Sequence, residues 1–157
     1  MADLAIRSGL YFEDFEVGNQ ATTQGRTISE ADVMAFASLS GDWNSIHVDA
    51  EYARQGPFGE RVAHGLLGLS IASGLAVQLG FMRETVIAFM GMNEWRFKAP
   101  VKLGDTITAR LTVSECRPMR RLGGGLVTFD VEILNQRAEI TQQGKWTMLV
   151  KSRPAES

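Results

Sequence analysis

The stretch GLLGLSIASGLAVQLGFM, which runs from Gly65 to Met82, contains no charged residue and decides the fold. As a helix it would span about 27 Å, which is short for a membrane span, and Arg83 and Glu84 follow at once. A helix that is apolar nearly all round lies either in a membrane or inside a protein. Because the segments around it are patterned as strands, we expect a central helix wrapped by a sheet and no transmembrane segment.

Strand patterns follow this helix. Thr85–Val101 is rich in β-branched and aromatic residues, and Gly91 within it suggests a bulge. Apolar and polar residues alternate over Thr106–Val113 and over Val127–Ile133, with glycines at 123, 124 and 125 as the hinge between them. A last strand carries Trp146, Met148 and Val150 on one face. Short turns favour antiparallel pairing, so the sequence predicts one α+β domain over residues 1–157.

Before the central helix, the chain carries helix start and stop signals. Ser29 is expected to cap a helix with acidic residues in its first turn. Apolar residues then recur at helical spacing until Gly41, which we expect to end the helix. Asp49 is expected to cap a second, short helix that runs through Gln55, and a short strand is expected over Gln20–Gly25.

The stretch SGDWNSIH, Ser40 to His47, places a carboxylate five residues before one of only two histidines. Loops on a rigid scaffold often carry reacting groups. If Asp42 and His47 both reach one water, they can hold and activate it, or share its protons as general base and acid. The alternative is a helix C-cap at Gly41 followed by an Asx turn at Asp42 or Asn44, with His47 merely packed.

Three blocks carry a resemblance to a known family. The segment Ser40–Ala53 resembles the hydratase motif of the MaoC-like, (R)-specific enoyl-CoA hydratases. Arg61–Leu67 resembles the entry to that family's central helix, and Trp95–Val101 with Gly104–Thr106 resembles the strand and turn that follow. The blocks occur in family order, and the similarity extends from about Phe15 to Lys151. The resemblance implies the hot-dog fold, an antiparallel sheet wrapped around a long central helix.

The resemblance also implies roles for individual residues. Asp42 and His47 match the water-holding pair, and which of them is base and which is acid stays open. Gly65 matches the glycine whose backbone N–H binds the thioester oxygen, and an unpaired N–H at a helix N-terminus suits that task. We assign substrate binding to Asn44, His64 and Ser73. For His64 the alternative is a structural histidine that holds the helix entrance, and for Ser73 a small helix-packing residue.

The implied reaction is the reversible hydration of a trans-2-enoyl-CoA to the (R)-3-hydroxyacyl-CoA, with coenzyme A as part of the substrate and no separate cofactor. One alternative is a hot-dog acyl-CoA thioesterase, but many of these bring a carboxylate from the central helix, and Gly65–Met82 has none. The other is a non-catalytic acyl-CoA-binding or regulatory domain. The acyl chain is not identified. Exposed edge strands favour pairing, and the resemblance implies at least a homodimer.

One departure from the family concerns the loop before His47. The family usually has proline where this chain has Ser45. Proline locks φ, so we expect Ser45 to leave the loop freer without changing the identity of Asp42 and His47.

The residue types and their spacing favour neither a metal site nor a reactive thiol. Asp42, His47 and His64 are conceivable zinc ligands by type, but the two histidines are far apart in sequence and no other residue has ligand spacing, so we predict no metal. Cys116 is the only cysteine, which excludes an intrachain disulfide, and we expect it to pack at the end of a strand.

The amino-acid composition and the net charge indicate which broad class of protein this is. Hydrophobic residues make up 45% and charged residues 22%, which is typical of a globular domain. The net charge of −2 does not indicate a nucleic-acid-binding protein, which would usually carry an excess of basic residues. Basic residues at Arg96, Lys98 and in Arg117–Arg121 are either solvated surface charge or contacts to the phosphates of coenzyme A. The segment Met1–Arg7 does not resemble a secretory signal, and we expect a cytoplasmic protein.

Overall fold

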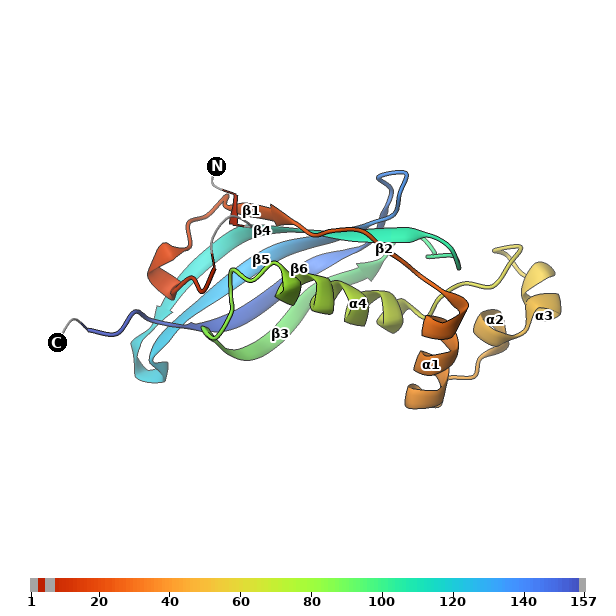
Figure 1. Cartoon of the computed structure of the whole chain (residues 1–157), viewed down its shortest axis with the longest axis horizontal. Coiled ribbons are helices and arrows are strands. Elements are labelled where there is room, and N and C mark those ends of the chain that lie inside the picture. The colour runs from red at the N-terminus through yellow and green to blue at the C-terminus, as the bar shows by residue number, and fades with distance from the viewer. Residues whose placement is uncertain (1–2, 5–7, 156–157) are drawn as a thin grey trace.

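The computed structural model describes residues 3–4 and 8–155, so most of the segment Met1–Arg7, on which the expectation of no secretory signal rests, lies outside the described residues. An antiparallel sheet curves around one helix, α4 (Gly65–Gln78), as Figure 1 shows. The strands lie in the order β1-β4-β5-β6-β3, and β2 pairs with β4 beside this path. This confirms the predicted α+β architecture. The strands are β1 (Gln20–Thr22), β2 (Arg26–Thr27), β3 (Val86–Phe97), β4 (Thr106–Met119), β5 (Gly124–Leu134) and β6 (Ile140–Lys151).

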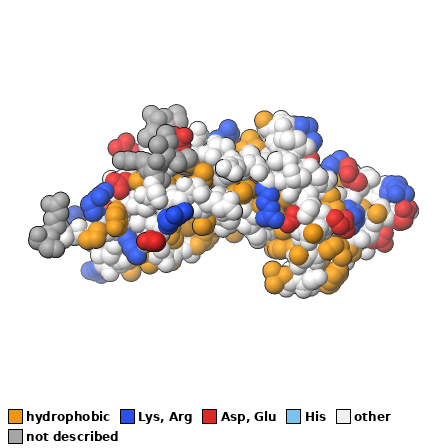
Figure 2. Space-filling view, in the orientation of Figure 1, with side chains coloured by type: hydrophobic (Ala, Val, Ile, Leu, Met, Phe, Trp, Pro, Cys, Tyr) orange, Lys and Arg blue, Asp and Glu red, His pale blue; other side chains and the backbone are white. Residues whose placement is uncertain are grey.

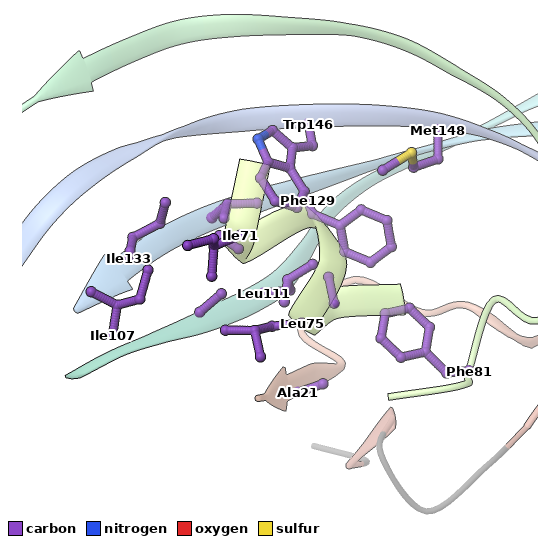
Figure 3. Close-up of a cluster of buried hydrophobic side chains, with 14 of the residues drawn as sticks. Ala21, Ile71, Leu75, Phe81, Ile107, Leu111, Phe129, Ile133, Trp146 and Met148 are labelled. Carbon is purple, nitrogen blue, oxygen red and sulfur yellow. The ribbon is translucent and has the colours of Figure 1, made fainter. Parts of the chain in front are cut away.

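The core lies between α4 and the concave face of the sheet. Alternation along β4 and β5 turns one set of side chains inward, and each member is at most 1% exposed: Ile107, Ala109, Leu111, Val113, Val127, Phe129, Val131 and Ile133. Figure 3 shows Ile71 and Leu75 of α4 among them, below Trp146 of β6. Burying one such side chain stabilises the fold by about 1.5–3 kcal/mol. The bulge expected at Gly91 is present, as a register shift between β3 and β6.

Helix α4 ends at Gln78, four residues before the end of the uncharged stretch. Gly80 has φ 81°, in the left-handed region that glycine reaches without a steric penalty. Behind this turn Phe81 is fully buried against Phe15 and Phe129. The stretch is uncharged to Met82 because its last residues form a buried turn, not because they extend the helix.

The sheet leaves one face of α4 uncovered. Leu66 and Val77 are 58% and 73% exposed, and Ser70 and Gly74 lie on the same stripe between them. The edge strand β3 carries further exposed apolar side chains: Val86, Ile87, Phe89, Met90, Met92 and Phe97. Among the described residues, no helix is both long and apolar enough to cross a membrane.

Three shorter helices precede α4: α1 (Glu30–Ser40), α2 (Ser45–Val48) and α3 (Ala50–Arg54). The caps were predicted correctly: Ser29 accepts from the Asp32 N–H, Gly41 ends α1 with φ 76°, and Asp49 caps α3. Helix α2 was not predicted. The remaining short elements are η2 (Phe12–Asp14) and η3 (Arg120–Leu122), the latter in the β4–β5 hairpin. Figure 2 shows hydrophobic side chains gathered over α1, where Leu39 is 84% exposed.

The open stripe of α4 and the apolar edge strand β3 support the prediction of at least a homodimer. An unpaired edge strand presents a row of unsatisfied backbone groups, which edge-to-edge pairing satisfies. Light scattering or sedimentation at micromolar concentration should give at least twice the monomer mass. A stable monomer over that range would contradict the prediction.

Ser45→Pro should stabilise the protein by about 0.4–1 kcal/mol, because proline reduces the entropy of the unfolded chain where the native backbone accepts it. Ser45 is the first residue of α2, a position that suits proline. The residue before it, Asn44, has φ −56° and ψ 133°, the extended conformation that a following proline requires. Urea denaturation measures the change, with Ser45→Ala as the control. A loss of stability in Ser45→Pro would show that this N–H or its φ matters to the loop.

Candidate functional site

His47 is held in place by a hydrogen bond from its ring. Its Nδ1 lies 2.7 Å from the backbone carbonyl oxygen of Val62. A carbonyl oxygen only accepts, so Nδ1 carries the hydrogen and Nε2 is left as the free nitrogen. The Val62 N–H in turn donates to the Ile46 carbonyl at 3.2 Å, which joins α2 to the segment that leads into α4. The side chain is 7% exposed, and it lines a cavity.

His64 joins the same segment to the loop that carries Asp42. Its Nε2 donates to the Asp42 carbonyl oxygen at 2.9 Å, and its ring stacks on that of His47 with centroids 3.8 Å apart. The Nδ1 of His64 is buried and has no hydrogen-bond partner among the described residues. These contacts agree with a histidine that holds the helix entrance.

An ion pair reinforces this entrance from outside. Both terminal nitrogens of the Arg61 guanidinium donate to the carboxylate of Glu30 in α1. These hydrogen bonds lower the pKa of Glu30 below its ordinary value. The Glu30 side chain is largely exposed to solvent, so the contribution of the pair to stability is small. Its effect is to connect α1 with the residues just before His64.

The fold brings Asp42, His47 and His64 together. One carboxylate oxygen of Asp42 and one ring nitrogen from each histidine all lie within 4.8 Å of one another. Two groups that share one water through hydrogen bonds of about 2.8 Å are about 4.5 Å apart. Asp42 is exposed, whereas both histidines are buried. The Asx-turn interpretation also holds, because the Asp42 carboxylate accepts from the Asn44 N–H at 3.2 Å.

The same three residues are a poor donor set for a metal. A metal bound by imidazole lies in the plane of the ring, about 2.0–2.1 Å from the nitrogen. The rings of His47 and His64 are stacked with an angle of 28° between their planes, so their lone pairs do not converge on one point. The Nε2 of His64 is also engaged by the Asp42 carbonyl. This arrangement favours a shared water over a metal.

A cavity of about 600 Å³ opens beside His47 and the N-terminus of α4. Apolar side chains dominate its lining, and its polar or charged members are His47, Lys98 and Gln142. Gly65 lies in the wall as the first residue of α4. A Cβ at this position would lie 2.6 Å from Cε1 of Phe97, so any side chain here would force the Phe97 ring to move. The N–H groups of the first helical turn have no acceptor within the helix.

Of the predicted site residues, His47 and Gly65 line the cavity, and four lie outside its lining: Asp42, Asn44, His64 and Ser73. Asn44 is exposed, and its side chain caps α2 by accepting from the Ile46 N–H. Ser73 lies on α4 two turns beyond Gly65, about 12 Å along the helix axis at 1.5 Å per residue. Asn44 contacts the pair only through its backbone, because its N–H donates to the Asp42 carboxylate at 3.2 Å and its carbonyl oxygen accepts from the His47 N–H at 2.9 Å.

Most of the cavity wall, including Phe97 and Gln142, was not predicted as part of the site. Phe97 lies at the end of β3, and Gln142 lies near the start of β6, 1% exposed. Gln142 has a signal in the sequence, because it shares the inward register of Trp146, Met148 and Val150 and is polar where they are apolar. Nothing in the pattern of Phe97 distinguishes it from its strand neighbours.

The basic residues divide into two places. Lys98 lines the cavity. Arg117–Arg121 lie in the β4–β5 hairpin, which Figure 1 shows at the opposite end of the sheet from α2. Within one chain, therefore, only the first place is near the candidate site. Cys116 is half-buried as expected, its thiol is 3.7 Å from the Phe15 carbonyl oxygen, and burial raises the pKa of the Cys116 thiol.

Comparison with known proteins gives a consistent family. A family model described as "MaoC like domain" matches residues 14–133. The chain is 36% identical over 143 residues to the (R)-specific enoyl-CoA hydratase of Rhodospirillum rubrum. The matched region covers 91% of this chain and 93% of that protein. One other curated relative is much longer, and the chain spans 30% of its length.

Solved structures agree with the sequence comparison. A monoamine oxidase regulatory protein from Archaeoglobus has a TM-score of 0.88 at 36% identity, with coverage of 94% of this chain and 98% of that one. An unliganded R-hydratase from Pseudomonas aeruginosa has a TM-score of 0.78 at 29% identity, with coverage of 96% and 95%. The fold is the hot-dog fold, as the resemblance implied, and the chain belongs to the MaoC-like dehydratase family.

Proposed function

We propose that this protein adds water reversibly to a trans-2-enoyl-CoA and gives the (R)-3-hydroxyacyl-CoA. The observation that carries the proposal is the juxtaposition of Asp42 and His47, within 4.8 Å, beside an apolar cavity whose wall contains the N-terminus of α4. The (R) configuration is supported by the relative from Rhodospirillum rubrum, an (R)-specific enoyl-CoA hydratase.

In the hydration direction, the pair holds one water near C3 of the substrate. One member takes a proton from the water as the new C3–O bond forms, and the other delivers a proton to C2. The carboxylate of the exposed Asp42 and Nε2 of His47 are the two reacting groups, and the one that delivers the proton to C2 enters the step protonated. His64 keeps the Asp42 backbone in position through its hydrogen bond to the carbonyl oxygen. Dehydration is the reverse of these steps.

As water adds, negative charge develops on the thioester oxygen. Donors already aimed at that oxygen stabilise the charge without reorganisation. We assign this task to the N–H of Gly65, in the first turn of the 14-residue helix α4. The partial positive charge at a helix N-terminus adds to the effect. The Gly65 N–H has no acceptor within the helix, which leaves it for the ligand.

The cavity suits an acyl thioester. Its walls are mostly apolar, as an acyl chain requires, and Lys98 supplies a cation for a phosphate group of coenzyme A. The thioesterase alternative is less favoured, because α4 carries no carboxylate. A non-catalytic acyl-CoA-binding domain would need neither Asp42 nor His47 in its present position.

Incubation with a short trans-2-enoyl-CoA should remove the conjugated-alkene absorbance without releasing free thiol. The product should be oxidised by an (R)-specific and not by an (S)-specific 3-hydroxyacyl-CoA dehydrogenase. Thiol released at a matching rate would indicate the thioesterase instead. Binding without either signal, across several chain lengths, would leave the non-catalytic domain as the best account.

Asp42→Asn should lower kcat by about a hundredfold to ten-thousandfold, the usual contribution of a general acid or base. The amide oxygen still accepts from the Asn44 N–H, so the turn is kept while the proton acceptor is lost. His47→Ala should do comparable damage, and the double variant should lose little beyond the worse single one. The matched control is Asp49→Asn, because Asp49 is also an exposed carboxylate that accepts from a backbone N–H. If the folded Asp42→Asn variant keeps near-normal turnover, the role of Asp42 is limited to forming the Asx turn.

A further inference from the structure

Gln142 is a buried amide in an otherwise apolar register of β6. It is 1% exposed, and it lies between the sheet and the first turns of α4, where it also lines the cavity. Burying an amide is unfavourable unless its hydrogen bonds are made. A residue of this kind therefore calls for a specific account of what it contacts.

Both ends of the amide are engaged. Its Nε2 donates to the Gly65 carbonyl oxygen at 2.9 Å, and its Oε1 accepts from the indole N–H of Trp95 at 3.2 Å. An indole nitrogen only donates and a carbonyl oxygen only accepts. The amide consequently fits in one orientation, with its NH₂ group towards α4 and its oxygen towards Trp95.

The Trp95 indole, which donates to the Gln142 amide, is itself fixed in position by its surroundings. Between Asn93 and Arg96 the register of β3 against β6 shifts, and Glu94 has φ 55° within this bulge. Bulges of this kind redirect side chains. The Trp95 indole stacks on Trp146, with ring centroids 5.9 Å apart, and a Cβ at position 144 would lie 2.7 Å from its Cε3. Trp95 is thus packed against β6 from two sides.

The helix comes unusually close to this amide. A Cβ at Gly68 would lie 2.7 Å from Nε2 of Gln142, and a Cβ at Gly65 would meet Phe97. The first turn of α4 therefore lies against the sheet where two glycines allow it. Gln142 supplies the side-chain hydrogen bond that connects β6 to this turn.

We propose that Gln142 is a positioning residue for the oxyanion donor: it pins the first turn of α4 to the sheet and so keeps the Gly65 N–H aimed into the cavity. The inference rests on the proposed function of that N–H. Misplacement of a reacting group by about 1 Å can cost about a hundredfold in rate. Gln142 acts through the backbone of Gly65 and not on the substrate.

Gln142→Met keeps the side-chain volume and removes both hydrogen bonds. It should lower kcat by about tenfold to a hundredfold, which does not exceed the decrease expected when a whole oxyanion donor is removed. KM should change by about twofold at most, because the cavity walls remain. The matched control is Gln143→Met, whose side chain lies on the opposite face of β6. An unchanged kcat in a folded Gln142→Met, or a raised KM alone, would overturn the proposal.

Gln142→Glu provides a rescue by pH. An ionised glutamate would turn an oxygen towards the Gly65 carbonyl, whereas a protonated one donates to it and accepts from Trp95 as glutamine does. The kcat of Gln142→Glu relative to wild type at the same pH should therefore rise as pH falls. A flat ratio would count against the orientation argument.

A readout independent of turnover separates this proposal from the proposed function. Amide hydrogen exchange over residues 65–69 should be faster in Gln142→Met than in Gln143→Met, whatever reaction the protein catalyses. If the wild-type protein does not hydrate enoyl-CoA, only the proposed function is contradicted. If amide hydrogen exchange over residues 65–69 is the same in Gln142→Met and Gln143→Met, only the positioning role is contradicted. If Gln142→Met does not fold, Trp95→Phe removes the orienting donor while keeping a ring, and it should show the same direction of change in kcat and exchange.

Discussion

The segment Val62–Gly65 is the constraint on which the site depends. Its first carbonyl accepts the Nδ1 hydrogen of His47, and the ring of His64 donates to the Asp42 carbonyl. The Ala63 N–H donates to the Val101 carbonyl at 2.7 Å, which attaches the segment to the chain after β3. Gly65 then begins α4. Four consecutive residues thus connect both members of the proposed pair and the proposed oxyanion donor to one piece of backbone.

Local patterns predicted most of the fold. The strands β4 and β5 were visible because their alternation has a period of two, and Ser29, Gly41 and Asp49 were visible because caps follow from side-chain chemistry at one position. Helix α2 was missed because four residues are too few to show a period. The open face of α4 was missed because an uncharged stretch does not indicate which side the sheet covers.

The candidate site was predicted only in part, because some of its residues have structural roles and one of its contacts is made by a backbone atom. Asp42 was interpreted either as a turn residue or as a reacting group, and the structure gives it the turn while placing it within 4.8 Å of both histidines. Asn44 caps a helix, and Ser73 lies two turns from the cavity. The Val62 carbonyl that orients His47 is a backbone atom, which no residue pattern can reveal.

The close approach of Gln142 to Gly68 has a consequence for how this chain can vary. With 2.7 Å between the amide nitrogen and the place a methyl group would occupy, the two positions are not independent. An alanine at 68 would push the Gln142 amide away from α4, and this movement would disturb its hydrogen bonds to Gly65 and Trp95. The effects of substitutions at 68 and 142 on the free energy of unfolding should therefore be non-additive, so the residue that this chain tolerates at one position depends on the residue at the other.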